Sequence, residues 1–203
     1  MKRFIMVSLL SLGLANAALA SENQEAWQKS HVLESKGEYE KAAAVLTPLL
    51  NNKASEYALL RYGWLNYLQG NYNDAIDSYK RALNFNPRSF DARLGMSLPL
   101  MAQGRWKEAS RYLKQVIGQS PYHYLAHVRL MICEEGLRQW EILEKHSQSM
   151  AAYYPSDATI LVYLARAYAW QDKETQAQAT YKRVLQRFPN HIEANNFLKN
   201  QSN

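Results

Sequence analysis

Four prolines recur at intervals of 34 residues in this chain, namely Pro87, Pro121, Pro155 and Pro189. Covalent geometry does not produce such a spacing unless one structural element is repeated. A period of 34 residues is typical of helix-turn-helix repeats, in which each repeat leaves an apolar face that only the next repeat covers. The spacing therefore predicts an all-α solenoid whose core runs along the stack.

Aligned on this period, the chain divides into about five repeats and a closing helix. The first repeat departs from the others because Pro48 falls within its second helix, and terminal repeats are often atypical because they cap the stack. The closing helix is expected to be amphipathic, with its apolar residues on one face. The predicted repeats are 23–55, 56–89, 90–123, 124–157 and 158–191, and the predicted closing helix is 192–200.

The second repeat shows most clearly which residue types recur. It contains, in chain order, Leu59, Tyr62 and Gly63 in the first helix, Gly70-Asn71-Tyr72 in the turn, and Ala75, Tyr79 and Ala82 before Pro87 in the second helix. This pattern closely resembles the tetratricopeptide repeat, and the resemblance spans nearly the whole chain after residue 20. The resemblance implies a right-handed superhelix whose concave inner face binds other proteins.

The recurring residue types have physical reasons. Gly63 and Ala75 are small because the two helices of a repeat cross closely at these positions. Gly70 permits the positive backbone angle that ends the first helix, and Pro87 stops the second helix. Tyr79 fills the volume between helices. These residues therefore specify the helix-turn-helix shape of the repeat.

The third and fourth repeats depart from this pattern. In the third repeat Pro99 falls inside the first helix, where it is expected to remove a hydrogen bond and bend the helix at a cost of ~3 kcal/mol. In the fourth repeat Arg138 replaces the turn glycine and Leu143 replaces the small residue at the helix crossing. We therefore expect the two helices of the fourth repeat to splay apart.

The first twenty residues differ in character from the rest of the chain. Lys2 and Arg3 precede an apolar run over residues 4–14, and the small residues Ala18 and Ala20 match a signal-peptide cleavage pattern. The run is shorter than the ~20 apolar residues that span a bilayer, which disfavours a membrane anchor. We expect cleavage after Ala20. The expected domains are a signal peptide at 1–20 and a repeat domain at 21–203 without a membrane span.

Charge and cysteine content argue against several classes of function. Lys2 and Arg3 leave with the signal peptide, so 22 basic residues then face 18 acidic ones and the net charge falls from +6 to +4. The basic residues are scattered without a run of like charges, which is not typical of nucleic-acid binding. Cys133 is the only cysteine and lies in an apolar helical stretch, so we expect no disulfide within the chain and a buried, inert thiol.

The sequence holds no arrangement typical of catalysis or cofactor binding. It has no nucleophile elbow, no glycine-rich phosphate loop and no cysteine pair. The best metal candidates are His123 and His127, four residues apart, with Glu134 or Glu135 further along the same helix. Two histidines do not complete a zinc site, which needs four ligands, or three and a water. We therefore expect no metal, no cofactor and no enzyme activity.

The resemblance also implies where a partner would bind. In the family, fixed positions of the first helix of each repeat line the concave face. The corresponding residues here are Trp27, His31, Tyr57, Arg61, Trp64, Tyr67, Leu98, Met101, Arg129, Ile132, Tyr163, Arg166 and Trp170. Flat aromatic rings bind with little loss of side-chain entropy, and arginines pair with carboxylates through two hydrogen bonds. Such a groove suits an extended peptide or a helix.

The alternative is that these aromatic residues belong to the core, as aromatic stripes at helical spacing usually do. For Arg61, Trp64, Tyr67 and Arg166 we prefer the groove, because arginine is seldom buried without a partner. The aromatic residues that follow the turns occupy a packing position instead. We assign to the core Tyr39, Tyr72, Trp106 and Trp140.

The function that the sequence favours is a non-catalytic scaffold or adaptor of the bacterial cell envelope, in the periplasm or outside the cell. It would hold a peptide or helix segment of another protein in the concave groove. A weaker resemblance of residues 164–171 to repeat domains of outer-membrane export systems supports an alternative, a companion in polysaccharide or protein export with direct glycan contacts. A third alternative is self-assembly of the chain into homo-oligomers.

Overall fold

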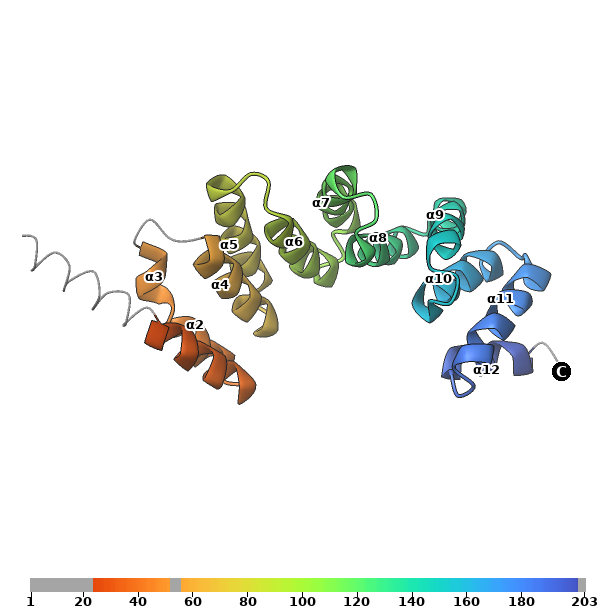
Figure 1. The fold of residues 1–203 in the computed structure, drawn as a ribbon, viewed down its shortest axis with the longest axis horizontal. Coiled ribbons are helices and arrows are strands. Elements are labelled where there is room, and N and C mark those ends of the chain that lie inside the picture. Colours follow the sequence, from red (N-terminus) through yellow and green to blue (C-terminus); the bar gives the residue numbers. More distant parts are fainter. Residues whose placement is uncertain (1–23, 52–55, 201–203) are drawn as a thin grey trace, which may run out of the picture. The chain divides into compact units, whose positions relative to one another are not determined.

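The computed structural model describes residues 24–51 and 56–200, and the regular elements in these ranges are all α-helices (Figure 1). The chain divides into two compact units with a boundary after Pro99, which we call unit 1 and unit 2. The predicted signal peptide, its cleavage after Ala20 and part of the predicted first repeat lie outside the described residues. No helix within the described ranges is both long and apolar enough to cross a membrane.

Unit 1 contains consecutive helices joined by short turns. A helical segment at 24–35 is followed by α2 (Tyr39–Ala44), α3 (Thr47–Asn51), α4 (Glu56–Leu68), α5 (Tyr72–Phe85) and the larger part of α6 (Phe90–Ala102). The turn between α4 and α5 has three residues, so the two helices pack side by side as an antiparallel pair. This pair forms the centre of unit 1.

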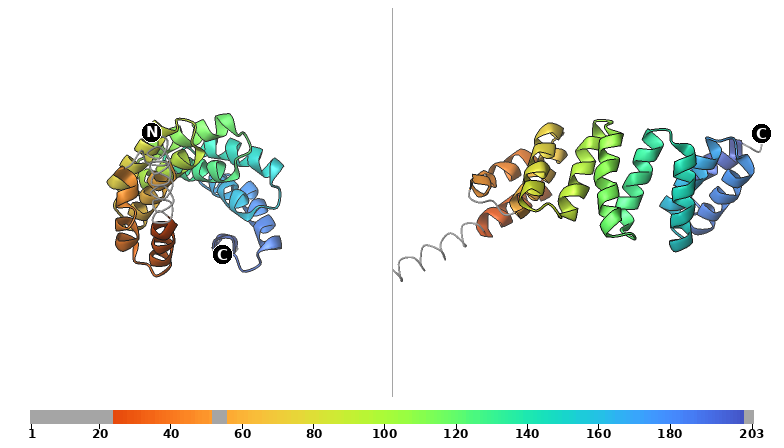
Figure 2. Two further views of the ribbon diagram at one scale, coloured as in Figure 1. Left: turned by 60° about the vertical axis from the view of Figure 1, so that its left-hand side comes forward. Right: turned by 90° about the horizontal axis from the view of Figure 1, so that it is seen from above.

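Unit 2 continues with the same alternation of helix and short turn. Its helices after α6 are α7 (Trp106–Gln119), α8 (Tyr124–Gly136), α9 (Trp140–Tyr153), α10 (Ala158–Ala169), α11 (Glu174–Arg187) and α12 (Ile192–Asn200). From α7 to α12 each helix packs against the next one in the chain, an order that Figure 2 also shows. The predicted fold class, an all-α solenoid of stacked helix pairs, is confirmed.

The two helices of a repeat bury their residues differently. In α5 the buried residues Ala75, Ile76, Tyr79 and Ala82 lie along one stripe, and the opposite side is polar and exposed. In α4 buried residues occur around most of the helix, from Ala58 to Asn66. A first helix of this kind is covered by neighbours on two sides, which leaves only a narrow strip of α4 for contact with a partner.

The turn between the two helices keeps one backbone geometry in every repeat. Glycines with positive φ stand at this position in the first three repeats, and in the last two the positions are held by Arg138 (φ 55°) and Asp172 (φ 57°). Arg138 therefore replaces the turn glycine in identity but not in conformation. The helices α8 and α9 contact each other less extensively than α10 and α11 do, as the larger Leu143 predicts.

We predict that Gly70→Ala lowers the free energy of unfolding by about 1 kcal/mol, because the backbone at this turn has φ +80° and a Cβ disfavours that conformation. The cost is purely conformational, since no atom lies within 4 Å of the added carbon. Gly118→Ala is the matched control. It also enters open space, but on helix α7 with an ordinary φ, and should stabilise by up to about 1 kcal/mol. Urea unfolding followed by circular dichroism measures the free energy of unfolding of both variants. If both substitutions changed it in the same direction and by the same amount, the conformational explanation for Gly70 would be contradicted.

The two unusual prolines have different consequences. Pro48 interrupts the second helix of the first repeat, which is divided into α2 and α3. A proline ring clashes with the carbonyl four residues earlier, and α2 ends at that residue, Ala44, before α3 starts at Thr47. Pro99 by contrast lies buried inside α6, which continues through it from Phe90 to Ala102.

A buried tyrosine ties the helices of unit 1 together. The side chain of Tyr79 is 3% exposed and lies against Gly63 of α4 and Gly95 of α6. A Cβ on Gly63 would lie 3.0 Å from the Tyr79 ring, and a Cβ on Gly95 would overlap the ring. The predicted close crossing at Gly63 is therefore present, and Gly95 forms a second close crossing that the sequence pattern did not indicate.

Candidate functional site

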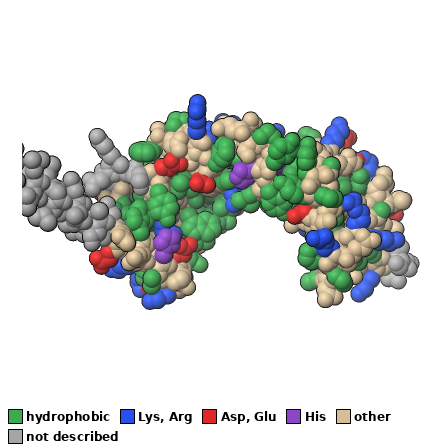
Figure 3. Space-filling model, viewed as in Figure 1, with side chains coloured by type: hydrophobic (Ala, Val, Ile, Leu, Met, Phe, Trp, Pro, Cys, Tyr) green, Lys and Arg blue, Asp and Glu red, His purple; other side chains and the backbone are tan. Residues whose placement is uncertain are grey.

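In unit 1 the structure brings the predicted site residues of the 24–35 helix and α4 into one surface, which we call the aromatic face of unit 1. The ring centroids of Trp27 and Tyr57 are 4.8 Å apart, and those of Trp64 and Tyr67 are 5.6 Å apart. Tyr72, which was assigned to the core, lies 6.0 Å from Tyr67 and extends the row. Figure 3 shows hydrophobic side chains gathered over this part of unit 1.

A network of polar side chains holds the residues of this face in position. The guanidinium of Arg61 forms an ion pair with Glu34 at 2.9 Å, and its Nε donates a hydrogen bond to the Ser30 hydroxyl. The other Glu34 oxygen accepts a hydrogen bond of 2.7 Å from the Trp64 indole. Burial alone would raise the pKa of Glu34, but the Trp64 hydrogen bond and the Arg61 ion pair hold it below its ordinary value. Glu34 therefore fixes both Arg61 and Trp64.

Arg61 is not a free surface group. Only 7% of the residue is exposed, and its Nη2 is the one buried side-chain nitrogen or oxygen within the described ranges that has no hydrogen-bond partner. The reason for placing Arg61 at the surface, that arginine is seldom buried without a partner, does not hold because Glu34 is that partner. The accessible part of the aromatic face is instead Tyr57, which is 52% exposed, and His31 on the preceding helix, whose side chain is 54% exposed.

The predicted site residues of α6 are less informative. Leu98 in unit 1 and Met101 in unit 2 are both half-buried. Neither carries a polar group that would select a ligand, and they lie on opposite sides of the unit boundary. The candidate site therefore does not include them.

In unit 2 the predicted residue Arg166 connects three helices. Its guanidinium binds both oxygens of Glu193 on α12, at 2.8 and 2.6 Å, and contacts Glu135 on α8 at 3.2 Å. It also lies 5.3 Å from the ring centre of Tyr163 on the same helix α10. Arg166 therefore holds the closing helix against the last repeats, and its donors are largely occupied.

The electrostatics of this cluster agree with a structural role. The hydrogen bonds with Glu193 raise the pKa of Arg166 above its already high ordinary value. Burial alone would raise the pKa of Glu193, but the hydrogen bonds from Arg166 and from the Tyr181 hydroxyl, the latter at 2.7 Å, hold it below its ordinary value. The sequence pattern did not identify Glu193 or Glu135 as partners of Arg166. Of the other predicted residues in unit 2, Arg129 and Ile132 are half-buried on α8.

Trp170 caps the carboxyl end of α10, where the turn begins. Its indole stacks on that of Trp140, with centroids 5.1 Å apart and planes inclined by 5°. Trp140 was assigned to the core, and it packs at the edge of the cluster around Leu143 and Met131. The pair therefore joins a core residue and a predicted site residue in one stack.

The two metal-candidate histidines serve other purposes. His123 accepts a hydrogen bond from the backbone of Ala126 at the start of α8. His127 is buried, and its Nε2 and Nδ1 lie 2.8 Å from the Pro121 carbonyl and from Nε2 of His146. His146 in turn lies 2.8 Å from Glu134. Within 24–51 and 56–200 no group of three His, Cys, Asp or Glu side chains is arranged to hold a metal ion.

Burial favours the neutral form of His127. The Pro121 carbonyl only accepts, so His127 Nε2 carries a proton and donates it. His127 Nδ1 accepts from His146 Nε2 when His127 is neutral, and donates to that atom when His127 takes a second proton. Burial lowers the pKa of His127 and thereby disfavours the second proton.

We predict that unit 2 loses stability as the pH falls below about 6.5, the ordinary pKa of histidine. A lowered folded-state pKa means that the unfolded chain binds the proton more readily, so His127 contributes its full stability above that pH and loses it on acidification. The measurement is urea unfolding between pH 7.5 and 5.5. His127→Gln retains a donor and an acceptor without titrating and should flatten the pH dependence, whereas the exposed His31→Gln should not. An unchanged slope in His127→Gln would contradict the prediction.

Cys133 has the predicted character of an inert thiol. It is fully buried in α8, and burial raises the pKa of its thiol to about 11. Because only the thiolate is a strong nucleophile, Cys133 is protonated and unreactive in the folded chain at neutral pH.

Models of the tetratricopeptide repeat family match this chain over residues 28–92, 67–121 and 160–191. Together these matches span more than half of its length. No protein in the curated set matches the sequence significantly.

Solved structures of repeat proteins share the fold at low sequence identity. MamA from Desulfovibrio magneticus RS-1, residues 41 to the end, superimposes with a TM-score of 0.76 at 18% identity, covering 84% of this chain and 97% of that one. A tetratricopeptide repeat protein from Parabacteroides merdae gives a TM-score of 0.78 at 14% identity, covering 87% and 71%. YrrB, described as a repeat protein with an unusual peptide-binding site, gives 0.73 at 18% identity, covering 90% and 97%.

Proposed function

Because this chain belongs to the tetratricopeptide repeat family, we propose that it is a non-catalytic scaffold that binds a peptide or helix segment of a partner protein on the aromatic face of unit 1. The observation that carries the proposal is the pairing of Trp27 with Tyr57 above the network of Glu34, Arg61 and Trp64. A protein-binding role is typical of the family, and the similar protein YrrB is described as having a peptide-binding site.

The aromatic face is ordered before any partner binds. Trp64 is held by its hydrogen bond to Glu34, and the Tyr57 ring rests against Trp27. Aromatic side chains have few rotatable bonds, so a partner that covers them loses little additional side-chain entropy. An interface of modest size with a flexible peptide is expected to bind in the micromolar range, about −8 kcal/mol.

The location of the protein is part of the proposal. Residues 1–20 have the character of a signal peptide, which would direct the chain to the periplasm or outside the cell. Amino-terminal sequencing of the protein from a periplasmic fraction should begin at Ser21. Recovery of the uncut chain from the cytoplasm would contradict the export part of the proposal and leave the binding part intact.

The binding experiment uses Tyr57→Ala and a matched control. Tyr57 is 52% exposed on the aromatic face, and Tyr122 is 60% exposed in unit 2, so Tyr122→Ala removes a comparable ring elsewhere. Each variant and the wild type serve as bait in a bacterial envelope extract, and proteins are identified by mass spectrometry. Segments of a candidate partner are then titrated against each bait.

The proposal predicts a partner whose segment binds wild type and Tyr122→Ala alike and binds Tyr57→Ala at least about tenfold more weakly, which corresponds to about 1.4 kcal/mol. Equal binding by all three baits would remove the aromatic face as the site. Recovery of the chain itself as the main partner would support self-assembly, and recovery of an outer-membrane export protein would support the companion role in export.

A further inference from the structure

Trp170 is exposed to an extent that packing does not explain. Its side chain is 65% exposed, more than that of any other large aromatic residue within 24–51 and 56–200. The stack with Trp140 covers one face of the indole, so the opposite face is open to solvent. An exposed large apolar side chain suggests a binding site, because its burial would otherwise be energetically favourable.

Equivalent positions in the other repeats show that the fold does not need an aromatic residue here. The residues one and two repeats before Trp170 are Gly136 and Ala102. At Gly136 the equivalent of Trp140, which is Trp106, lies so close that an added Cβ would be 2.7 Å from its ring. In the fourth repeat a glycine therefore packs directly against the tryptophan of the preceding second helix, whereas in the fifth repeat an exposed indole stacks on the equivalent tryptophan.

The position of the Trp170 stack is held by polar contacts across the turn. The Gln171 amide donates hydrogen bonds to Glu144, at 2.8 Å, and to the backbone carbonyl of Trp140. Lys173 forms an ion pair of 2.6 Å with the same Glu144 oxygen. These contacts join the end of α10 to α9, so the open face of the indole is fixed without a ligand.

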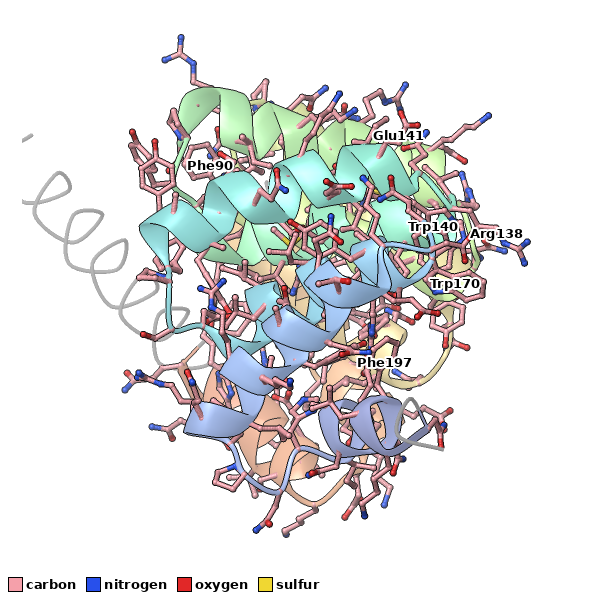
Figure 4. All side chains as sticks on the ribbon, turned by 90° about the vertical axis from the view of Figure 1, so that its right-hand side faces the viewer. Phe90, Arg138, Trp140, Glu141, Trp170 and Phe197 are labelled. Carbon is pink, nitrogen blue, oxygen red and sulfur yellow. The ribbon has the colours of Figure 1, made fainter. Side chains whose placement is uncertain are left out.

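A hollow of about 360 Å³ lies beside Trp140 of the stack and is lined by polar side chains together with the apolar Trp140 and Ile142. Arg138, Gln139 and Glu141 contribute to its lining, and Figure 4 shows Arg138 next to Trp140 and Trp170 at one edge of unit 2. Within the described part of the chain, the side chains of these three residues form no hydrogen bond or ion pair. The hollow thus offers the guanidinium of Arg138, the amide of Gln139 and the carboxylate of Glu141 as hydrogen-bonding groups. The charges of the guanidinium and the carboxylate cancel.

We propose that the Trp170 stack and this hollow form a binding site for a neutral saccharide ring, which we call the Trp170 site. One side of a pyranose presents C–H groups, whose partial positive charge is attracted to the negative face of an indole. Its rim presents hydroxyl groups, which both donate and accept, and these match the guanidinium, amide and carboxylate around the hollow.

Other occupants match this chemistry less well. A cation would be attracted to the indole face, but the hollow would add no net attraction, because the charges of Arg138 and Glu141 cancel. An aromatic or aliphatic side chain would use the indole but leave the polar groups of the hollow without partners as they lose water. A neutral, hydroxylated ring satisfies both kinds of group. The Trp170 site lies in unit 2 and does not depend on the proposed peptide binding in unit 1.

The test is a nuclear magnetic resonance titration of the nitrogen-15 labelled protein, in which the five tryptophan indole N–H signals report separate places. Single Trp→Phe variants assign the signals. The probes are maltohexaose, cellohexaose and the hexamer of N-acetylglucosamine, each added to about 10 mM, with tetramethylammonium chloride as the cation probe. A dissociation constant in the millimolar range is detectable at this concentration.

The proposal predicts that at least one oligosaccharide shifts the Trp170 and Trp140 signals and leaves those of Trp27 and Trp64 unchanged. Trp170→Ala, which introduces the residue found at the equivalent position in the third repeat, should weaken binding at least about tenfold. Arg138→Gly should also weaken binding, and it removes only the side chain because a glycine is well suited to the positive φ there.

Three outcomes would overturn the proposal. They are the absence of a Trp170 shift with all three oligosaccharides, a shift with tetramethylammonium but not with sugar, and equal binding by Trp170→Ala and wild type. Circular dichroism of each variant checks that the fold is intact. Failure of the peptide-binding proposal would leave these outcomes unaffected, because they are read from different tryptophans.

Discussion

Replacing Gly95 with alanine is expected to destabilise unit 1 by about 2 kcal/mol, although the same substitution normally stabilises a helix. Gly95 lies in α6, and the added Cβ would overlap the buried ring of Tyr79. The ring of Tyr79 has little room to move, because it also lies against Gly63 and is buried. Overpacking of about 1–3 kcal/mol, or more where no atom can give way, thus outweighs the helix-propensity gain of about 1 kcal/mol.

The measurement is the free energy of unfolding in urea, with Gly118→Ala as the control for helix propensity. A second variant separates crowding from other causes: in a Tyr79→Leu background the ring is gone, so Gly95→Ala should cost much less there than in wild type. The difference between the two costs is the coupling energy of the pair. A neutral or stabilising Gly95→Ala would mean that Tyr79 is not held between the two helices.

The repeat architecture was predictable from the sequence because its signals are local and periodic. Pro87 and its equivalents end the second helices, and Gly70 takes the positive φ that the turn requires. Arg138 shows the limit of this reasoning. The turn keeps its conformation with an arginine, since packing on both sides determines the backbone there more strongly than the preference of one residue.

The roles of the two arginines were not predicted, because the sequence pattern of a first helix does not show whether its arginine faces a ligand or a carboxylate of a neighbouring repeat. The pairing has a detectable pattern in retrospect. Arg61 contacts residues 27 and 31 positions before it, and Arg166 contacts residues 27 positions after and 31 before it. A separation of 31 is the 34-residue repeat less about one helical turn, and a separation of 27 is the repeat less about two turns. A search for opposite charges at such offsets would have found both pairs.

The Trp170 stack was missed for a different reason. Trp140 and Trp170 occupy positions that were assigned to separate surfaces, the core and the concave face. They meet because the end of one first helix lies over the start of the preceding second helix, as Gly136 lies over Trp106. This is a property of the packing between neighbouring repeats, which the pattern within a single repeat does not contain.

The second large effect is expected for Arg61→Ala, which should destabilise unit 1 by about 2–3 kcal/mol. Removing one partner of a buried ion pair typically costs about 3–5 kcal/mol, and the lower value applies because Glu34 retains some contact with water. Trp64 also loses the fixed position of its acceptor. Arg88→Ala is the control, since Arg88 is exposed in the same unit and its replacement should change stability by less than about 0.5 kcal/mol.

The pH dependence identifies the ion pair as the cause. The pKa of Glu34 is lowered in the folded chain, so the pair contributes fully above the ordinary glutamate pKa and its contribution is lost as the pH falls through the lowered value. The difference in stability between wild type and Arg61→Ala should therefore shrink below about pH 4.5. A difference that stays constant down to pH 3 would assign the effect to lost side-chain packing instead.

Partner binding by Arg61→Ala then distinguishes a structural arginine from a ligand-binding one. The network of Glu34, Ser30 and Trp64 predicts lower stability, with partner affinity largely retained at a temperature where the variant is folded. The opposite result, unchanged stability with lost binding, would mean that the ion pair opens when a partner arrives. The Nη2 atom of Arg61, which has no acceptor in the free protein, would then be the donor that the partner satisfies.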